Sequence, residues 1–234
     1  MKVILLAAGF GTRLRPLTNN LPKCLASING VPLLQIWLDT LFNSGLHEVL
    51  INTHYLSKKV EDFISSSKYR DKVILSYENV LLGTAGTVFN NIAFIKNEPV
   101  MVIHADNLSI FKISDFISAH ENRPSHCNMT MMIFKTDDPK SCGIVELDEL
   151  GVVVGFYEKS MNPPSTLANA AIYILEPAMV QEYQSYKPKI TDISTEIIPM
   201  NLGKIFTYVN SQYHRDIGSL QSLRLANIEY RVGK

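Results

Sequence analysis

Cysteine is scarce in this chain of 234 residues, and its scarcity argues against a disulfide framework. The three cysteines, Cys24, Cys127 and Cys142, are odd in number and far apart, and none stands in a Cys-x-x-Cys pair. A small secreted domain held by disulfides needs more cysteines at regular spacings, and a structural zinc site needs closely paired ones. The sequence therefore predicts reduced thiols and a cytoplasmic location.

Net charge and long apolar runs are absent as well. The 22 Lys and Arg residues balance 22 Asp and Glu residues, and a net charge of zero argues against a general affinity for nucleic acid or anionic membranes. No apolar run approaches the roughly 18 residues that a membrane span needs, and the N-terminal run is too short for a signal peptide. We expect no nucleic-acid or membrane partner, and any cationic site must be local.

The first 23 residues combine a short strand pattern with a glycine-rich loop. Apolar residues at 3–7 lead into a loop that contains Gly9 and Gly11. Because glycine has no Cβ, the backbone N–H groups of such a loop can approach phosphate oxygens closely. Arg13 and Lys23 add fixed positive charge beside them. This favours a triphosphate site, although an isolated Gly-x-Gly also fits a tight turn with surface cations.

Neither standard nucleotide motif is complete. The dinucleotide fingerprint needs a third glycine where Leu14 stands, and the Walker loop needs a Gly-Lys-Ser/Thr sequence that is absent. The longer string Leu-Ala-Ala-Gly-x-Gly-Thr-Arg-Leu-x-Pro-Leu-Thr at 6–18, followed by Pro22-Lys23, resembles the signature of the sugar-1-phosphate nucleotidyltransferases, which make NDP-sugars. The resemblance implies catalytic roles for Arg13 and Lys23, and nucleotide binding by Leu6, Ala8, Gly9, Gly11, Thr12, Arg13 and Lys23.

Helical and strand patterns alternate along the first part of the chain. Strands are expected at 49–52, 73–76, 100–104 and 129–134, helices at 33–44, 57–65 and 87–95 with one more capped by Ser114, and an irregular connection at 25–32. Later we expect a hairpin at 144–147 and 152–157, strands at 170–175, 204–209 and 213–216, and helices at 177–183, 194–198 and 219–230.

This order predicts an α/β fold with a Rossmann-like, mixed, mainly parallel sheet and helices on both faces. By resemblance the fold is GT-A-like, with a small β-rich lobe that binds the sugar. We expect a single nucleotidyltransferase domain over 1–234, with a nucleotide-binding half at about 1–135, a sugar-binding lobe at about 140–190, and C-terminal strands and a helix that complete the domain. No room remains for the C-terminal β-helix of many relatives.

Two aspartates follow strand patterns and are candidate Mg²⁺ ligands. Asp106 follows the apolar strand at 100–104, and the carboxyl ends of parallel strands are where ligands bind. Mg²⁺ prefers hard oxygen ligands that it shares with substrate phosphates. Asp216 stands in an Asp-x-Gly that resembles the family's second metal carboxylate. Asp106 could instead cap a turn, and Asp216 could precede a helix capped by Ser219. Strand alternation puts His104 on the face of Asp106.

The stretch after the third strand resembles the family's base and ribose site. Glu78, Gly83 and Thr84 are its candidate residues, and a helix that begins near Gly86 would offer further N–H donors. A glycine-rich helix entry would have the same sequence. The Gly-Thr-Ala-Gly sequence at 83–86 is similar to that of mannose-1-phosphate guanylyltransferases. GTP is therefore the first choice of donor, with mannose 1-phosphate or a heptose 1-phosphate as acceptor.

The sugar phosphate is assigned to the later segments by resemblance. The candidates are Asn107, Gly143, Glu158, Lys159 and Asn169. Glu158-Lys159 could also be an exposed ion pair. Cys142 and Ala171 replace an aromatic residue and a glycine of the family pattern, so the identity of the sugar stays open. Ala105 replaces the glycine before Asp106, and the resulting Ala-Asp-Asn is similar to that of choline-phosphate cytidylyltransferases.

Other functions remain compatible with the sequence. The alternatives are a UTP- or dTTP-dependent sugar-1-phosphate transferase, a CTP-dependent cytidylyltransferase acting on phosphocholine, and a nucleotide-sugar sensor without catalysis. Intact Arg13, Lys23, Asp106 and Asp216 argue against the sensor. The sequence leaves open whether the chain forms a homo-oligomer, which pathway uses the product, polysaccharide biosynthesis being the family's usual one, and what His104 does. The remaining histidines are interpreted as surface or packing residues.

Overall fold

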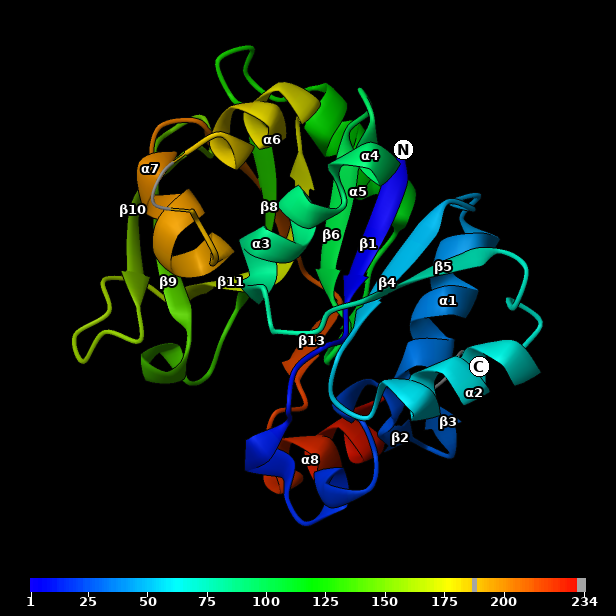
Figure 1. Ribbon diagram of the computed structural model, residues 1–234. Helices are drawn as coiled ribbons and strands as arrows, with labels where there is room; N and C mark the ends of the chain where they lie inside the picture. Colours follow the sequence, from blue (N-terminus) through cyan, green and yellow to red (C-terminus); the bar gives the residue numbers. More distant parts are fainter. Residues whose placement is uncertain (187–188, 231–234) are drawn as a thin grey trace. The chain divides into compact units, whose positions relative to one another are not determined.

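The chain folds into two compact units, each built from discontinuous segments (Figure 1). The computed structural model describes residues 1–186 and 189–230. The terminal unit consists of Lys2–Leu81, Ile103–Ser109 and the chain from Tyr213 onward, and the central unit consists of Met1, Leu82–Val102 and Ile110–Gln212. The division into a half at 1–135 and a lobe at 140–190 stays a prediction.

Three parallel strands form the framework of the terminal unit. They are β1 (Lys2–Leu6), β4 (Val49–Thr53) and β5 (Val73–Tyr77), and Val49 pairs with both Val3 and Val73. β1 and β4 are buried over nearly their whole length, which agrees with the apolar runs at 3–6 and 49–51 in their sequences. Because the strands are parallel, their carboxyl ends meet at one edge of the sheet.

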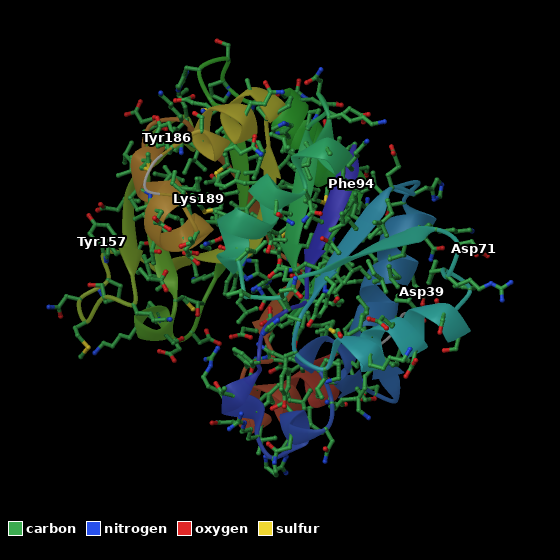
Figure 2. The ribbon with its side chains drawn as sticks, in the orientation of Figure 1. Asp39, Asp71, Phe94, Tyr157, Tyr186 and Lys189 are labelled. Atoms are coloured by element: carbon green, nitrogen blue, oxygen red, sulfur yellow. The ribbon has the colours of Figure 1, made fainter. Side chains whose placement is uncertain are left out.

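The crossover helices of this unit follow their predicted patterns. α1 (Leu33–Asn43) buries an apolar stripe that includes Trp37 and Leu38, and Gly45 adopts a φ of 83° just after its end. α2 (Ser57–Ser66) buries only Val60 and Ile64. Asp39, labelled on α1 in Figure 2, accepts a hydrogen bond of 2.5 Å from the Tyr69 hydroxyl. This bond fastens α1 to the segment that precedes β5.

The connection at 25–32 is more regular than expected. It contains β2 (Ser27–Ile28) and β3 (Val31–Pro32), an antiparallel hairpin closed by Asn29 and Gly30 with φ values of 50° and 85°. Positive φ at both central residues is typical of a type I′ turn, and Asn-Gly is its strongest sequence signal. The prediction of an irregular segment was therefore wrong, although the signal was present.

The remaining strands of the terminal unit come from distant parts of the sequence. β6 (Val100–His104) leads into it, and Ala105 just after β6 donates its backbone N–H to the Leu6 carbonyl at 3.0 Å. β7 (Asn107–Ile110), which the sequence did not indicate, pairs with β13 (Tyr213–Asp216). α8 (Leu220–Glu229) follows at once, and its N-cap Ser219 accepts the Ser222 N–H at 3.1 Å.

The central unit contains the predicted hairpin and its neighbouring strands. β9 (Gly143–Leu147) and β10 (Val153–Glu158) are antiparallel, and Tyr157 of β10, labelled in Figure 2, donates to Glu146 at 2.5 Å. β11 (Leu167–Leu175) is antiparallel to β8 (Met129–Lys135) and β9, whereas β12 (Ile205–Asn210) is parallel to β8. The sheet is therefore mixed, as predicted.

Two helix predictions in the central unit need correction. The helix expected at 87–95 is two helices, α3 (Gly83–Asn90) and α4 (Ile92–Ile95). Asn91 separates them because its side-chain amide donates to the Thr87 carbonyl at 2.8 Å, an alternative to the helical backbone pattern. α5 (Ile113–Glu121) begins after Lys112 and is not capped by Ser114, whose hydroxyl instead contacts the neighbouring Asp115.

The last helical elements of the central unit are short. They are α6 (Pro177–Gln184), a π-helical turn at Ile193–Ile197 and α7 (Ile198–Met200). Of the helices formed by the described residues, none is both long and apolar enough to cross a membrane.

A buried histidine connects α5 to β8 in the central unit through a side-chain contact. His120 is 2% exposed, and its Nδ1 and Nε2 lie 2.8 Å from the Thr130 hydroxyl and 3.0 Å from a Glu176 oxygen. Arg123 also donates to Glu176, at 2.6 Å. Burial and the charge of Arg123 lower the pKa of His120 to about 4, although the Glu176 carboxylate acts in the opposite direction.

This histidine should make the fold sensitive to acid. Below pH 6.5 an unfolded chain protonates His120, whereas the folded chain does so only near pH 4, so the unfolded state binds more protons. We expect the free energy of unfolding to fall by about 1–3 kcal/mol across that range. Urea unfolding at several pH values measures this loss. A His120→Gln variant should show a flatter profile than wild type or the exposed-site control His126→Gln, and equal slopes in all three proteins would contradict the assignment.

Candidate functional site

The glycine-rich loop after β1 is held in shape by its own neighbours. Gly11 has a φ of 62°, and a Cβ there would lie 3.0 Å from Thr18 Cγ2 and 3.2 Å from Lys23 Cβ. The Thr18 hydroxyl donates to the Gly11 carbonyl at 2.7 Å. Gly11 is therefore required by both conformation and space. At Gly9 a Cβ would meet no protein atom within 4 Å, and the close approach of phosphate oxygens at Gly9 stays a prediction.

A pocket with a volume of about 160 Å³ opens beside this loop. Six of the predicted nucleotide-binding residues line it, whereas Ala8 is buried and does not. The pocket is lined by Leu6, Ala7, Gly9, Gly11, Thr12, Arg13, Lys23, Cys24, Asp106 and Gly218.

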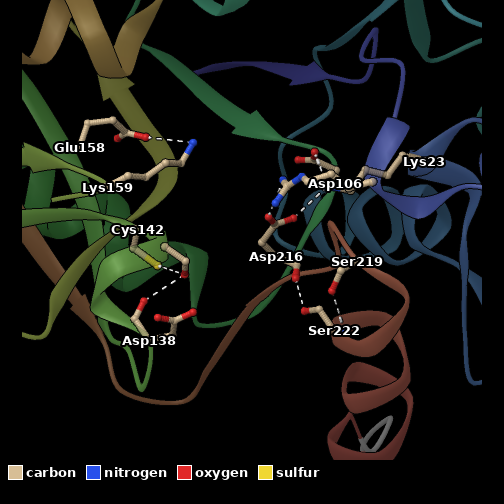
Figure 3. A network of polar contacts seen from close by, with 11 residues as sticks. Lys23, Asp106, Asp138, Cys142, Glu158, Lys159, Asp216, Ser219 and Ser222 are labelled. Atoms are coloured by element: carbon tan, nitrogen blue, oxygen red, sulfur yellow. Dashed lines mark hydrogen bonds and ion pairs between the residues drawn. The ribbon is translucent and has the colours of Figure 1, made fainter. Parts of the chain in front are cut away.

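Lys23 lies between the two predicted metal carboxylates (Figure 3). Its Nζ is 2.7 Å from Asp106 Oδ2 and 2.8 Å from Asp216 Oδ1, and the residue is 8% exposed. A 3₁₀ turn at Lys23–Leu25 supplies the lysine, the turn between β6 and β7 supplies Asp106, and the end of β13 supplies Asp216. The structure therefore brings together three residues that are 83 and 193 positions apart in the sequence.

The ionisation states in this cluster follow from its charges. Burial raises the pKa of Asp106, but the charges of Lys23 and His104 outweigh burial and hold that pKa below its usual value. Burial likewise lowers the pKa of Lys23, and the two carboxylates outweigh it and raise that pKa. Burial, with a smaller effect of Asp106, raises the pKa of the Cys24 thiol to about 12. The Asp106 carboxylate and the Lys23 ammonium are thus charged at neutral pH, and the Cys24 thiol is protonated.

Arg13 reaches the same cluster from the loop. Its Nη2 is 3.3 Å from Asp216 Oδ2, and its side chain is 73% exposed. A Cβ at residue 218 would lie 2.7 Å from that nitrogen, so Gly218 makes room for the guanidinium. The sequence quoted Gly218 only as part of an Asp-x-Gly pattern and did not identify this function. Arg13 can turn toward an anion in the pocket because so much of it faces solvent.

The two carboxylates fit the ligand preference of a divalent cation. One oxygen of Asp106 and one oxygen of Asp216 both lie within hydrogen-bond distance of the Lys23 Nζ, so the two carboxylates face a common point. Within the described ranges, no group of three or more acidic, histidine or cysteine side chains is placed to hold a metal ion. Asp106 and Asp216 would be the carboxylates that this site supplies. Mg²⁺ is commonly bound in this way, by one or two carboxylates plus substrate phosphates and water.

Helix α8 supports both sides of this cluster. Arg215, next to Asp216, makes two hydrogen bonds of 2.8 Å to the Glu229 carboxylate, and the Ser222 hydroxyl donates to the Asp216 carbonyl. Asn227 of α8 accepts the Asn29 N–H of the β2–β3 hairpin at 2.7 Å. The hairpin begins two residues after the Lys23 turn, so α8 fixes the segments that carry Lys23 and Asp216.

The predicted site residues Asn107 and Glu78 are buried, and His214, which the sequence assigned to the surface or to packing, is half-buried. Asn107 is 6% exposed, and its carbonyl accepts the Trp37 indole N–H at 2.8 Å. His214 lies 2.6 Å from the Ser109 hydroxyl, and burial lowers its pKa to about 3. Glu78 is 2% exposed, and its carboxylate accepts the Asn52 side-chain amide at 2.9 Å. Sequence reasoning did not identify Asn52 because its partners are at other strand ends.

The predicted base-recognition helix differs from expectation. Gly83 and Thr84 belong to the central unit, and the helix begins at Gly83 rather than near Gly86. The N–H groups of Ala85 and Gly86 donate to the Thr191 carbonyl at 2.9 and 3.3 Å. They are therefore already bonded, whereas we expected N–H groups here to donate to a ligand. Gly83 has a φ of 78°, and a Cβ there would lie 2.3 Å from the same carbonyl. Thr84 donates to Asp192 at 3.1 Å.

The predicted sugar-phosphate residues also belong to the central unit. Gly143 of β9 pairs with Glu158 of β10, and a Cβ at Gly143 would lie 2.7 Å from Glu158 Oε2. Lys159 Nζ lies 3.5 Å from Glu158 and is 67% exposed (Figure 3). Lys159 has a φ of 48°, a left-handed conformation that is uncommon for lysine. The structure therefore gives Glu158 a close backbone neighbour and leaves the lysine accessible.

Asn169 stabilises an irregular point in β11. Its Oδ1 accepts the Ala171 N–H at 2.8 Å, and its Nδ2 donates to the Tyr173 hydroxyl at 2.7 Å. Ala171 has a φ of 53°, in the region that glycine adopts most readily. This conformation accounts for the glycine that the family pattern has at this position.

Gly11→Ala tests the shape of the loop. We expect a loss of about 1–3 kcal/mol in the free energy of unfolding, because a methyl group would meet Thr18 and Lys23 in a left-handed conformation. The displaced Lys23 should also weaken nucleotide binding at least tenfold, measured by calorimetry. Gly203→Ala is the matched control, since Gly203 has a φ of 80° but open space around it. Equal nucleotide affinities in the two variants would contradict the steric argument.

Comparison with known proteins gives consistent results. A family model described as nucleotidyl transferase matches residues 2–232. The chain is 30% identical over 221 residues to mannose-1-phosphate guanylyltransferase of Mycobacterium tuberculosis, covering 92% of this chain and 60% of that protein. It is 31% identical over 202 residues to the mannose-1-phosphate guanylyltransferase catalytic subunit beta of Drosophila melanogaster, covering 85% and 53%. The chain thus spans between half and two thirds of the length of these curated relatives.

Solved structures confirm the predicted fold class. HddC from Yersinia pseudotuberculosis complexed with GMP-PN has a TM-score of 0.82 and 24% identity to this chain, covering 98% of this chain and 99% of that one. A second crystal structure of HddC from Yersinia pseudotuberculosis has a TM-score of 0.83 and 23% identity to this chain, covering 98% of this chain and 99% of that one. The fold is therefore α/β with a mixed, mainly parallel sheet, as the sequence predicted.

Proposed function

The chain belongs to the nucleotidyl transferase family, and on this basis we propose that it joins a nucleoside triphosphate to a sugar 1-phosphate and releases pyrophosphate. GTP is the first choice of donor, and mannose 1-phosphate or a heptose 1-phosphate is the first choice of acceptor. The curated relatives are named mannose-1-phosphate guanylyltransferases, and a neighbour of the same fold is complexed with GMP-PN. The product would enter nucleotide-sugar and polysaccharide biosynthesis.

One observation carries this proposal: the lysine and both carboxylates meet at the pocket beside the glycine-rich loop. In the reaction a phosphate oxygen of the sugar phosphate attacks the α-phosphorus of the nucleotide. A new P–O bond forms, and the bond from the α-phosphorus to the oxygen of the leaving pyrophosphate breaks. Because the attacking phosphate is already anionic, the enzyme needs no dedicated base, and positioning and charge stabilisation are its main contributions.

The residues of the pocket suit the charges of a triphosphate. The loop from Gly9 to Thr12 would present backbone N–H groups, and Arg13 would turn its guanidinium toward phosphate oxygens. Lys23 would act as a point charge. Asp106 and Asp216 would hold Mg²⁺, which when bound neutralises charge on the phosphates. We also assign to the nucleotide site Leu6, which lines the pocket, and Ala8, which is buried and does not line it.

The remaining candidates would recognise the base and the sugar. We assign Glu78, Gly83 and Thr84 to the base and ribose, and Glu158, Lys159, Gly143, Asn169 and Asn107 to the sugar phosphate. The exposed ammonium of Lys159 and its left-handed backbone support its assignment, because strained conformations concentrate at functional sites.

A pyrophosphate-release assay tests the proposal. Purified protein with Mg²⁺ is offered GTP, UTP, dTTP, CTP or ATP, each with mannose, glucose or heptose 1-phosphate or with phosphocholine. Release with one sugar 1-phosphate pair, absent in an Asp106→Asn control preparation, would support the reaction and identify both substrates. Pyrophosphate release only with CTP and phosphocholine would replace the proposed donor and acceptor. No pyrophosphate release with any pair would contradict transferase activity.

A further inference from the structure

Asn52, at the carboxyl end of β4, makes two hydrogen bonds to other strand ends of the terminal unit. Its Oδ1 accepts the backbone N–H of Ala7 at 2.7 Å, and its Nδ2 donates to Glu78 Oε1 at 2.9 Å. Asn52 is 3% exposed. We propose that Asn52 is a positioning residue that couples the Glu78 carboxylate to the glycine-rich loop, so that recognition of the nucleotide at Glu78 is transmitted to the phosphate-binding backbone. This inference rests on the proposed function.

The chemistry of the site requires a side chain that both accepts and donates. The register of β1 against β4 ends at the pair Leu6 and Asn52, so Ala7 is the first residue beyond the ladder. Its N–H needs an acceptor, and the Glu78 carboxylate needs a donor, because unsatisfied polar groups away from water are costly. An amide meets both needs at once. Aspartate could accept from Ala7 but would place a second carboxylate against Glu78.

Glu78 is held by three consecutive residues at the end of β4. Besides the Asn52 bond, its backbone N–H donates to the Thr53 carbonyl at 2.8 Å, and its carbonyl lies 2.7 Å from His54 Nδ1. The carboxylate, the N–H and the carbonyl of Glu78 therefore all have partners in 52–54. A shift of Glu78 must move the end of β4.

The glycine-rich loop contacts the same strand end at a second point. The ring of Phe10 packs edge-on against His54 and Tyr55, with ring centroids 5.6 and 5.5 Å apart. The loop is thus fixed to 52–55 at both Ala7 and Phe10. Gly9, which lines the pocket, lies between these two points and has open space where a Cβ would be, so its position is set by the two fixed ends.

A double-mutant cycle tests the coupling. Asn52→Asp keeps an acceptor for the Ala7 N–H but places its carboxylate against the Glu78 carboxylate. Glu78→Gln replaces that second carboxylate with an amide, which can donate to an aspartate at position 52. We expect Asn52→Asp alone to weaken binding of GTP, or of the triphosphate that wild type prefers, by about 10- to 100-fold. In the Glu78→Gln background the same change should cost less than about twofold. The readouts are the Kd from calorimetry and the KM, with kcat affected less than KM.

Asn201→Asp is the matched control. Asn201 is fully buried in the central unit, donates to the Ile197 carbonyl at 2.8 Å and accepts from the Tyr183 hydroxyl at 3.1 Å. This variant should lose stability with unchanged nucleotide Kd and KM, which separates positioning from general destabilisation.

The outcomes separate this inference from the proposed function. Unchanged nucleotide affinity in Asn52→Asp, or a loss of the same size in both Glu78 backgrounds, would overturn the coupling even in an active enzyme. A wild type that binds nucleotide but releases no pyrophosphate with any acceptor would contradict the proposed reaction, while the Kd cycle would still decide the role of Asn52.

Discussion

Replacement of Lys23 by methionine is expected to lower the free energy of unfolding by about 2–3 kcal/mol, or Tm by about 4–12 °C. Lys23 is the cation shared by Asp106 and Asp216, which would otherwise face each other as like charges. Removal of one partner from a buried ion pair costs about 3–5 kcal/mol, and the lower figure applies because the carboxylates are 36% and 46% exposed. Thermal and urea unfolding measure the change.

Magnesium should partly restore the stability of the Lys23→Met protein. A divalent cation that binds the folded state replaces the missing charge, so its addition should raise Tm more in the variant than in wild type. Lys58→Met is the control, because Lys58 is 78% exposed and its ion pairs with Glu61 and Asp62 lie on the surface. That change should cost less than about 0.5 kcal/mol. Equal losses in the two variants would contradict the role of Lys23.

Asp106→Asn should abolish turnover by at least about 10³-fold and leave the fold nearly unchanged. The neutral side chain keeps its shape, and Lys23 retains Asp216 at 2.8 Å. The net charge of Lys23, residue 106 and Asp216 rises from −1 to zero. The ion pair between Lys23 and Asp106 is lost, but the repulsion between the two carboxylates disappears as well. The expected change in stability is therefore below about 1 kcal/mol.

Two measurements check this variant together. Pyrophosphate release gives the loss of activity, and titration with Mn²⁺ by electron paramagnetic resonance should show weaker metal binding. Asp71→Asn, at an aspartate whose side chain is 84% exposed, should behave as wild type in both. Substantial turnover in Asp106→Asn would remove Asp106 from the metal site.

Local patterns in the sequence predicted the bounds of several elements closely. The strands at 100–104 and 213–216 coincide with β6 and β13, and α1 differs from its prediction by one residue. Short apolar runs and helical spacing are properties of neighbouring residues, so a single sequence contains them. The resemblance to a family then placed Lys23, Asp106 and Asp216 in one site, and the structure brings them together.

The errors concern contacts between residues that are far apart in sequence. The start of α3 depends on the Thr191 carbonyl, and β7 depends on its partner β13. The role of Asn52 depends on two strand ends that meet only after the parallel sheet has formed. Composition and periodicity contain no information about such pairings. The Asn29-Gly30 hairpin is the exception, because its turn signal was local and was overlooked.

The position of Asp216 and α8 has a consequence for biosynthesis of the protein. A ribosome makes the glycine-rich loop and Lys23 first, but the second carboxylate and the helix that braces it come from 213–229. While the chain is being made, Lys23 can pair with Asp106 long before Asp216 exists. A nascent chain therefore carries the glycine-rich loop without its complete pair of acidic groups, and the cluster of Lys23, Asp106 and Asp216 is complete only when α8 has been synthesised and has docked.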